Sequence, residues 1–220
     1  MMRIVCEILD DIKARGMDAA LAYTEKFDHL TLTPDEVWWH PLQSDSLAIP
    51  DDQRHAIDTA ARQIRRYHEA MKPQAPPVLH NGPLVTTSRW VPLTRVGLYV
   101  PNGGFPLISS VMMTAIPAQV AGVSEIVVAI PPRGDVKNNP LWRYVLQLLQ
   151  IDTVLLLGGA QAIGVLGYGV PGFSPVDLIA GPGNAYVAEA KQELFRRKVV
   201  GIDGVAGPSE VLVLADGSAN

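Results

Sequence analysis

The stretch that decides the fold reads Val154-Leu155-Leu156-Leu157-Gly158-Gly159-Ala160-Gln161. A short apolar run breaks into glycine and then resumes with a helix-like pattern. Three other segments, 96–104, 126–134 and 177–184, repeat this order with glycine or proline at the break. Short strands that alternate with helices of this length indicate βα units in a parallel sheet. Because the loops after parallel strands meet at one edge of the sheet, we expect a ligand to bind there.

The same alternation continues from Val96 to Val200 and predicts a doubly wound, parallel α/β domain over residues 93–206. We expect strands at 96–100, 125–130, 153–157 and 176–180, and helices at 107–121, 140–149, 160–168 and 184–197. A fifth apolar strand is expected at 209–215, in a segment 207–220 that returns to the first domain. A buried parallel strand is normally followed by a crossover helix, so the pattern predicts a truncated unit here.

Residues 1–92 predict a mostly helical region, which we assign to the N-terminal part of the first domain. Apolar residues recur at helical spacing from Val5 to Ile12, and Gly16 is expected to end that helix. We expect further helices at 18–27 and 50–71, a short strand at 37–40, a proline-rich loop at 72–81 and a polar β-run at 84–91. The boundary is placed near Pro92.

Composition excludes several classes of protein. The chain has 220 residues, a net charge of −4 and no basic block, which argues against nucleic acid as a partner. Its single cysteine, Cys6, rules out an internal disulfide and a cysteine-rich zinc site. No apolar stretch of about 18 residues and no signal peptide is present, so we expect no membrane partner and a cytoplasmic location.

The loops lack the standard nucleotide-binding fingerprints. No G-x-G-x-x-G and no G-x-x-x-x-G-K-[ST] follows any expected strand, and the glycines of residues 158–164 have the wrong spacing. Binding of a pyrophosphate by a standard Rossmann glycine-rich loop is therefore disfavoured. Helix N-termini after glycine can still bind anionic or amide groups through their free N–H groups.

Three loop-end residues are open to two interpretations. Asn184 ends Gly181-Pro182-Gly183-Asn184 and is either a plain helix cap or a ligand contact. Gln161 is either a solvated first-turn residue or an amide that faces a ligand. Tyr99 is either part of the core or a group beside a binding loop.

Other polar residues carry weaker signals. Ser209 follows a glycine-proline turn with no histidine nearby, which disfavours a hydrolase nucleophile. The five histidines precede the expected α/β domain and lack metal-binding spacing. Glu189, Lys191 and Glu193 are predicted to form a solvated helix face, and Asp203 is predicted to make a turn.

Taken together, the loops carry a family resemblance along nearly the whole chain. The segments concerned are 23–28, 96–101, 114–123, 158–163 (Gly-Gly-Ala-Gln-Ala-Ile), 177–191 (with Gly-Pro-Gly-Asn) and 206–213. In this order they resemble the histidinol dehydrogenase family. The resemblance implies two incomplete Rossmann-like domains in an intertwined homodimer. It also implies the NAD- and zinc-dependent oxidation of L-histidinol, a small-molecule substrate, to L-histidine in two steps through an aldehyde.

The resemblance assigns Tyr99, Gln161 and Asn184 to NAD binding and Ser209 to substrate binding. It places the zinc ligands and the acid–base pair in segments downstream of Ser209 that this sequence does not contain. We therefore expect no catalytic residue and no metal ligand in this chain, and an NAD-facing half that is inactive alone. Asn102 replaces a glycine of the family pattern and bulky Phe105 follows, which predicts an altered pocket beside Tyr99.

Two other functions remain open at this point. One is a paralogous zinc- and NAD-dependent enzyme for another small alcohol, such as a sulfonated diol. The other is a non-catalytic module that binds a dinucleotide or pairs through apolar surface. An apolar edge strand at 211–214 would require a covering partner, which motivates the second alternative.

Overall fold

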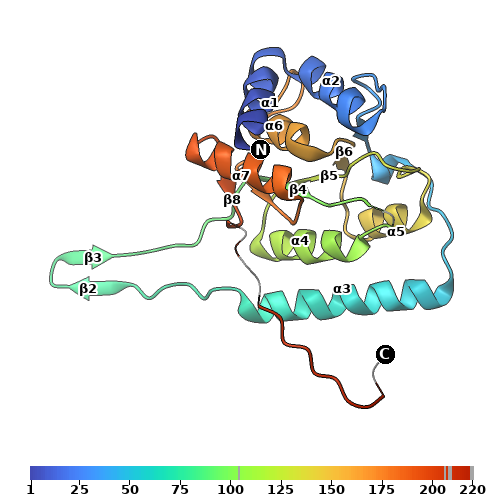
Figure 1. Cartoon of the computed structure of the whole chain (residues 1–220). Coiled ribbons are helices and arrows are strands. Elements are labelled where there is room, and N and C mark those ends of the chain that lie inside the picture. The colour runs from blue at the N-terminus through green and yellow to red at the C-terminus, as the bar shows by residue number, and fades with distance from the viewer. Residues whose placement is uncertain (104, 206, 208–209, 219–220) are drawn as a thin grey trace.

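The computed structural model describes residues 1–103, 105–205, 207 and 210–218, and it confirms the α/β fold class (Figure 1). A six-stranded sheet has the order β1-β6-β5-β4-β7-β8. The parallel strands are β4 (Arg95–Tyr99), β5 (Glu125–Ala129), β6 (Thr153–Leu155), β7 (Leu178–Ala180) and β8 (Gly201–Ile202). Their carboxyl ends therefore meet at one edge of the sheet.

The four expected crossover helices are present, with ends within a few residues of those expected. They are α4 (Ile108–Ala121), α5 (Pro140–Leu148), α6 (Gly159–Tyr168) and α7 (Ala185–Arg196). Asparagine caps two of them, because the side chains of Asn139 and Asn184 accept hydrogen bonds from backbone N–H groups of the first turn.

Helices cover both faces of the sheet and enclose two hydrophobic cores. On one face, α1 (Met2–Arg15) and α2 (Met17–Asp28) pack with α6 and α7. On the other, α3 (Asp51–Met71) packs on α4, which contacts α5. The N-terminal helices thus share their cores with the sheet, and the division of the chain near Pro92 stays a prediction. None of the described helices has the length and apolar character needed to cross a membrane.

The region before β4 has a strand within the expected 37–40 and another within the expected β-run 84–91, and it adds a strand at the end of the expected loop 72–81. Strand β1 (Trp38–Trp39) pairs antiparallel with β6 and is followed by the short helix η1 (Pro41–Gln43). A hairpin of β2 (Leu79–Asn81) and β3 (Leu84–Thr86) projects from the body as an arm (Figure 1). Its first strand falls at the end of the expected loop 72–81, since the turn Gly82-Pro83 lets the chain reverse.

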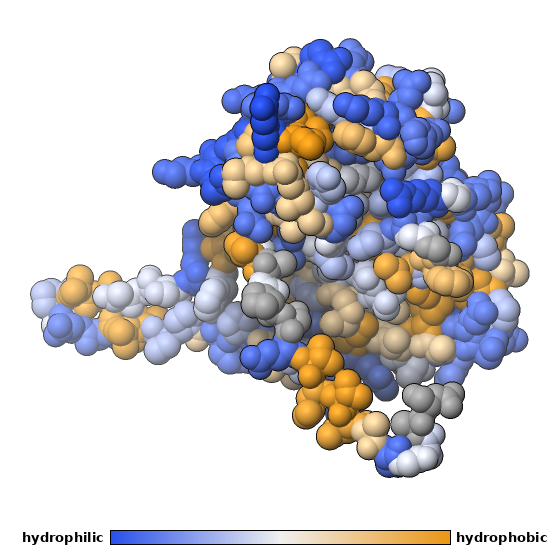
Figure 2. Space-filling view, in the orientation of Figure 1, coloured by the Kyte–Doolittle hydropathy of each residue, from blue (hydrophilic) through white to orange (hydrophobic). Residues whose placement is uncertain are grey.

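The expected fifth strand is wrong for residues 210–215, the part of it that lies within the described residues. These residues form no strand, and Val211 to Leu214 are 77–87% exposed. Figure 2 shows them as an apolar stretch outside the folded body. A strand needs a neighbour for its N–H and C=O groups, and no strand described here pairs with this one.

Gly164 sets the close approach of α1 to α6. A Cβ at this position would lie 2.8 Å from Cδ1 of Ile12 and 3.3 Å from Cδ2 of Leu9. We expect Gly164→Val to lower the free energy of unfolding by about 1–3 kcal/mol through overpacking. Gly164→Ala should lower the free energy of unfolding by less, because its single methyl displaces only the end of the Ile12 side chain. Alanine also has a higher helix propensity than glycine.

Denaturant unfolding followed by tryptophan fluorescence measures both variants. Gly217→Val is the matched control, since a Cβ at Gly217 meets nothing within 4 Å. Equal stability of the Gly164→Val and Gly217→Val variants would contradict the packing described for α1 and α6.

The Tyr144 side chain connects α5 to α3, and its phenol has a raised pKa. Its hydroxyl donates to Oδ1 of Asp58 at 2.6 Å. Burial, together with this bond to a carboxylate, raises the pKa of Tyr144 to about 12. An unfolded tyrosine has a pKa of about 10, so the contribution of this group to stability is complete below pH 10. It is then lost as pH rises towards 12, because the unfolded chain releases the proton first.

The stability difference between the wild type and Tyr144→Phe should therefore shrink across pH 10 to 12. Denaturant unfolding at a series of pH values measures this difference. Tyr67→Phe, at a tyrosine that is 61% exposed, is the control. A stability difference that stays constant over that range would show that folding does not raise the pKa of Tyr144.

Candidate functional site

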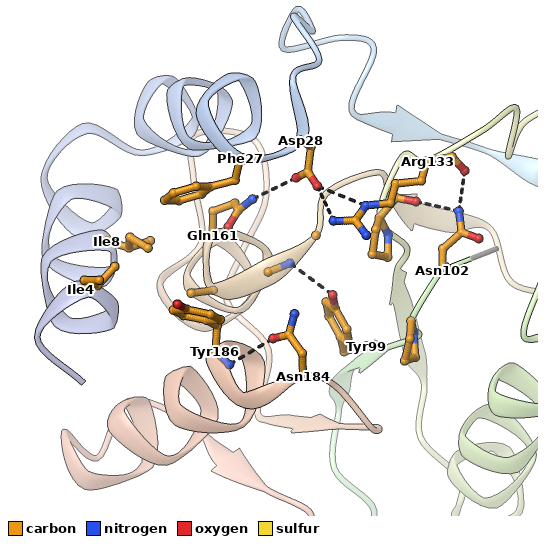
Figure 3. A pocket seen from close by; sticks show the side chains of 16 residues that line it. Ile4, Ile8, Phe27, Asp28, Tyr99, Asn102, Arg133, Gln161, Asn184 and Tyr186 are labelled. Carbon is orange, nitrogen blue, oxygen red and sulfur yellow. Dashed lines mark hydrogen bonds and ion pairs between the residues drawn. The ribbon is translucent and has the colours of Figure 1, made fainter. Parts of the chain in front are cut away.

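A pocket of about 410 Å³ opens at the carboxyl edge of the sheet (Figure 3). The loops after β4, β5 and β6 and the start of α7 line it, and α1 and α2 close one side through Ile4, Ile8, Phe27 and Asp28. This is the place that the repeated βα pattern predicted for a ligand.

Tyr99, the last residue of β4, lies at the base of the pocket and is 3% exposed. Its hydroxyl accepts a hydrogen bond from the Gly159 N–H at 3.1 Å. Burial raises the pKa of the Tyr99 phenol above its ordinary value, and the Gly159 bond offsets only part of this effect. The phenol is therefore neutral at physiological pH and retains its own O–H as a donor.

Gln161 lies in the first turn of α6 and is 2% exposed, so it is no solvated surface residue. Its Nε2 is 3.5 Å from Oδ2 of Asp28. Arg133, after β5, donates to Oδ1 of the same carboxylate at 3.0 Å. The Asp28 side chain is only 6% exposed whereas Arg133 is 60% exposed, so the guanidinium compensates a buried charge and also faces solvent.

The N-terminus of α6 faces the pocket without a side-chain cap among the described residues. Gly158 precedes the helix and supplies no cap, and residues 158–161 line the pocket. The first N–H groups of a helix and its dipole together favour an anion. The Gly159 N–H already donates to the Tyr99 hydroxyl, so the N–H groups that follow it are the ones suited to a negatively charged ligand group.

Asn184 combines the two roles that the sequence left open. Its Oδ1 accepts from the N–H groups of Tyr186 and Val187, at 3.0 and 3.1 Å, and so caps α7. The residue also lines the pocket, and its amide nitrogen takes no part in the cap (Figure 3). That nitrogen is a donor within reach of the pocket.

The expected solvated face of α7 is wrong at two of its three residues. Lys191 is 7% exposed and Glu193 is 8% exposed. The Lys191 ammonium donates to the Gly181 carbonyl at 2.9 Å and to Asp203. Glu193 accepts from Arg197, one turn along the helix. Their charge predicted solvent exposure, but both groups are buried with partners, as a buried charge requires.

Asn102 has a structural explanation. Its Nδ2 donates to the carbonyl oxygens of Pro131 and Arg133, at 2.9 and 2.7 Å, and so joins the loops after β4 and β5. Phe105 is 82% exposed and does not line the pocket. The departure from the glycine pattern therefore adds a link between two loops, and the bulky ring stays outside.

The structure brings three of the four predicted site residues together, since Tyr99, Gln161 and Asn184 line one pocket. Ser209 lies outside the described residues. Sequence reasoning did not assign Asp28 or Arg133 to the site, although both lie in segments that it singled out, 23–28 and 126–134. Among the described residues, no group of three His, Cys, Asp or Glu side chains could hold a metal ion.

Comparisons with known proteins agree on one family. The sequence model of histidinol dehydrogenase matches residues 1–220. Histidinol dehydrogenase of Gluconobacter oxydans is 43% identical over 212 residues, which cover 96% of this chain and 49% of that protein. The enzyme of Dechloromonas aromatica is 44% identical over 221 residues, with 99% and 50% covered.

A solved structure supports the same relationship. The crystal structure of histidinol dehydrogenase from Elizabethkingia anophelis matches with a TM-score of 0.78 and 33% identity, over 99% of this chain and 50% of that one. The chain spans about half the length of the curated relatives it matches. With its whole length matched by the family model, this chain belongs to the histidinol dehydrogenase family.

Proposed function

We propose that this chain is the NAD-binding half of a histidinol dehydrogenase, an oxidoreductase that converts L-histidinol to L-histidine. One observation carries the proposal. Tyr99, Gln161 and Asn184, from three separate βα loops, line a single pocket at the carboxyl edge of the sheet. The family relationship supports the choice of substrate and cofactor.

The pocket fits part of a dinucleotide in size and chemistry. Its volume of about 410 Å³ lies within the range of small-molecule sites, roughly 300–1,000 Å³. The uncapped start of α6 suits a phosphate group, and the Gln161 and Asn184 amides suit the carboxamide and hydroxyl groups of the cofactor. The Arg133 guanidinium, paired with Asp28, also faces solvent and can donate beside the pocket.

The chain's own residues bind and orient the cofactor. When bound, NAD supplies the hydride acceptor for an alcohol oxidation. The neutral Tyr99 phenol offers a donor that does not titrate near pH 7, and Ile4 and Ile8 supply an apolar wall on one side. The described residues do not fit a zinc site, so we assign no step to zinc here.

The substitution at Asn102 does not favour the alternative substrate, since Asn102 joins two loops and Phe105 lies outside the pocket.

The exposed apolar stretch 211–214 favours a covering partner. We propose a second copy of the chain, in the homodimer that the resemblance implies. A dimer in sedimentation equilibrium supports this proposal, and a monomer at micromolar concentration contradicts it.

We expect the 220-residue chain to bind NAD. The Gln161→Met variant should bind NAD about tenfold more weakly, because methionine lacks the buried amide that is proposed to contact the ligand. Isothermal titration calorimetry measures both dissociation constants. Gln63→Met, at an exposed position of α3, is the matched control and should bind as the wild type does. Absence of saturable NAD binding by the wild type would refute the proposed function of this pocket.

We also expect no turnover by this chain on its own. The resemblance places the acid–base pair and the zinc ligands outside its sequence, so no described group is assigned to the hydroxyl proton. Incubation with L-histidinol, NAD and zinc should give no rise in NADH absorbance. Clear NADH formation would show that the chain itself carries the catalytic groups.

A further inference from the structure

Lys191 is a buried cation that the proposed binding site does not use. Its side chain is 9% exposed, and it does not line the pocket of Tyr99, Gln161 and Asn184. An ammonium withdrawn from water is costly unless it is paired and hydrogen-bonded. Its partners therefore indicate why α7 buries a lysine at this place.

Those partners surround a single residue, Gly181. The Lys191 ammonium donates to the Gly181 carbonyl at 2.9 Å and to Oδ1 of Asp203 at 2.5 Å. The other oxygen of Asp203 accepts from the Gly181 N–H at 2.8 Å. The ion pair thus holds both backbone polar groups of Gly181 and leaves it little freedom to rotate.

Gly181 is held in a conformation that needs such support. Its φ is +112°, a region that favours glycine. It also lies directly against the β4 backbone, so that a Cβ would overlap the Tyr99 carbonyl oxygen. Because β7 itself is paired with β4, rotation at Gly181 would change the direction in which residues 182–184 leave the sheet.

The constraint extends from Gly181 to Asn184. Pro182 has a restricted φ, and a Cβ at Gly183 would overlap the side chain of Val187. Asn184 follows at once and reaches the pocket while it caps α7. The place of its amide thus depends on the orientation of Gly181.

We propose that Lys191 and Asp203 are positioning residues, which hold Asn184 and Tyr99 at the separation required to contact one dinucleotide. The inference rests on the proposed NAD-binding function. It goes beyond that function because neither residue lines the pocket.

The experiment compares Lys191→Met, Lys191→Arg and the control Lys72→Met in the 220-residue chain. Lys72 is an exposed lysine after α3, so its substitution removes the same charge elsewhere. We expect Lys191→Met to raise the Kd for NAD by about tenfold in calorimetry, Lys191→Arg to restore part of the affinity, and Lys72→Met to have no effect. The Asn184 side-chain NMR signals should shift in Lys191→Met and not in the control.

A second variant separates positioning from stability. Asp203→Asn should also weaken NAD binding, and the double variant with Lys191→Met should bind no more weakly than Lys191→Met alone, because both act through Gly181. If Lys191→Met does not fold, Lys191→Arg and Asp203→Asn provide the test. A folded Lys191→Met with lowered Tm but wild-type Kd and unchanged Asn184 signals would overturn the inference.

The two proposals can fail separately. If the wild type does not bind NAD, the proposed function is refuted, and the Asn184 signals then decide the positioning role. A shift in Lys191→Met supports that role, and unchanged signals reject it. If the wild type binds and the variants bind equally well, only the positioning role is refuted.

Discussion

The candidate site depends on the way Tyr99 connects the ends of three strands. Its hydroxyl accepts the Gly159 N–H after β6, and its backbone lies against Gly181 after β7. In the sheet, β6 and β7 lie on opposite sides of β4. Contacts made at the end of β4 therefore bring together loops from both halves of the sheet. Since burial favours the neutral phenol, this connection involves no charge and persists across physiological pH.

The parts of this arrangement that local pattern controls could be predicted from the sequence. Apolar runs followed by glycine or proline place the strands, and parallel strands bring their following loops to one edge. Asn184 could be predicted as a cap because side-chain oxygens at that position accept from the first N–H groups of a helix. Tyr99, Gln161 and Asn184 were accordingly expected at strand and loop ends, and the structure places them around one pocket.

Parts that depend on distant partners could not be predicted in this way. The charge of Lys191 predicts solvent exposure, yet the residue is buried because Asp203 and the Gly181 carbonyl satisfy its ammonium. Asp28 and Arg133 meet only in the folded chain. The apolar stretch 211–214 has the composition of a strand, but composition supplies no neighbour to pair with it.

The charges around the site explain how it can suit an anion without a standard nucleotide fingerprint. Asp28 with Arg133, and Lys191 with Asp203, form two ion pairs whose charges cancel. The pairs orient the loops, but they give the site no net positive charge. Attraction for a phosphate must then come from oriented backbone N–H groups at the start of α6, where, among the described residues, Gly158 supplies no cap and the Tyr99 hydroxyl accepts only from Gly159. A glycine at Gly158 suits this role, because a residue with a capping oxygen would occupy the groups that a ligand needs.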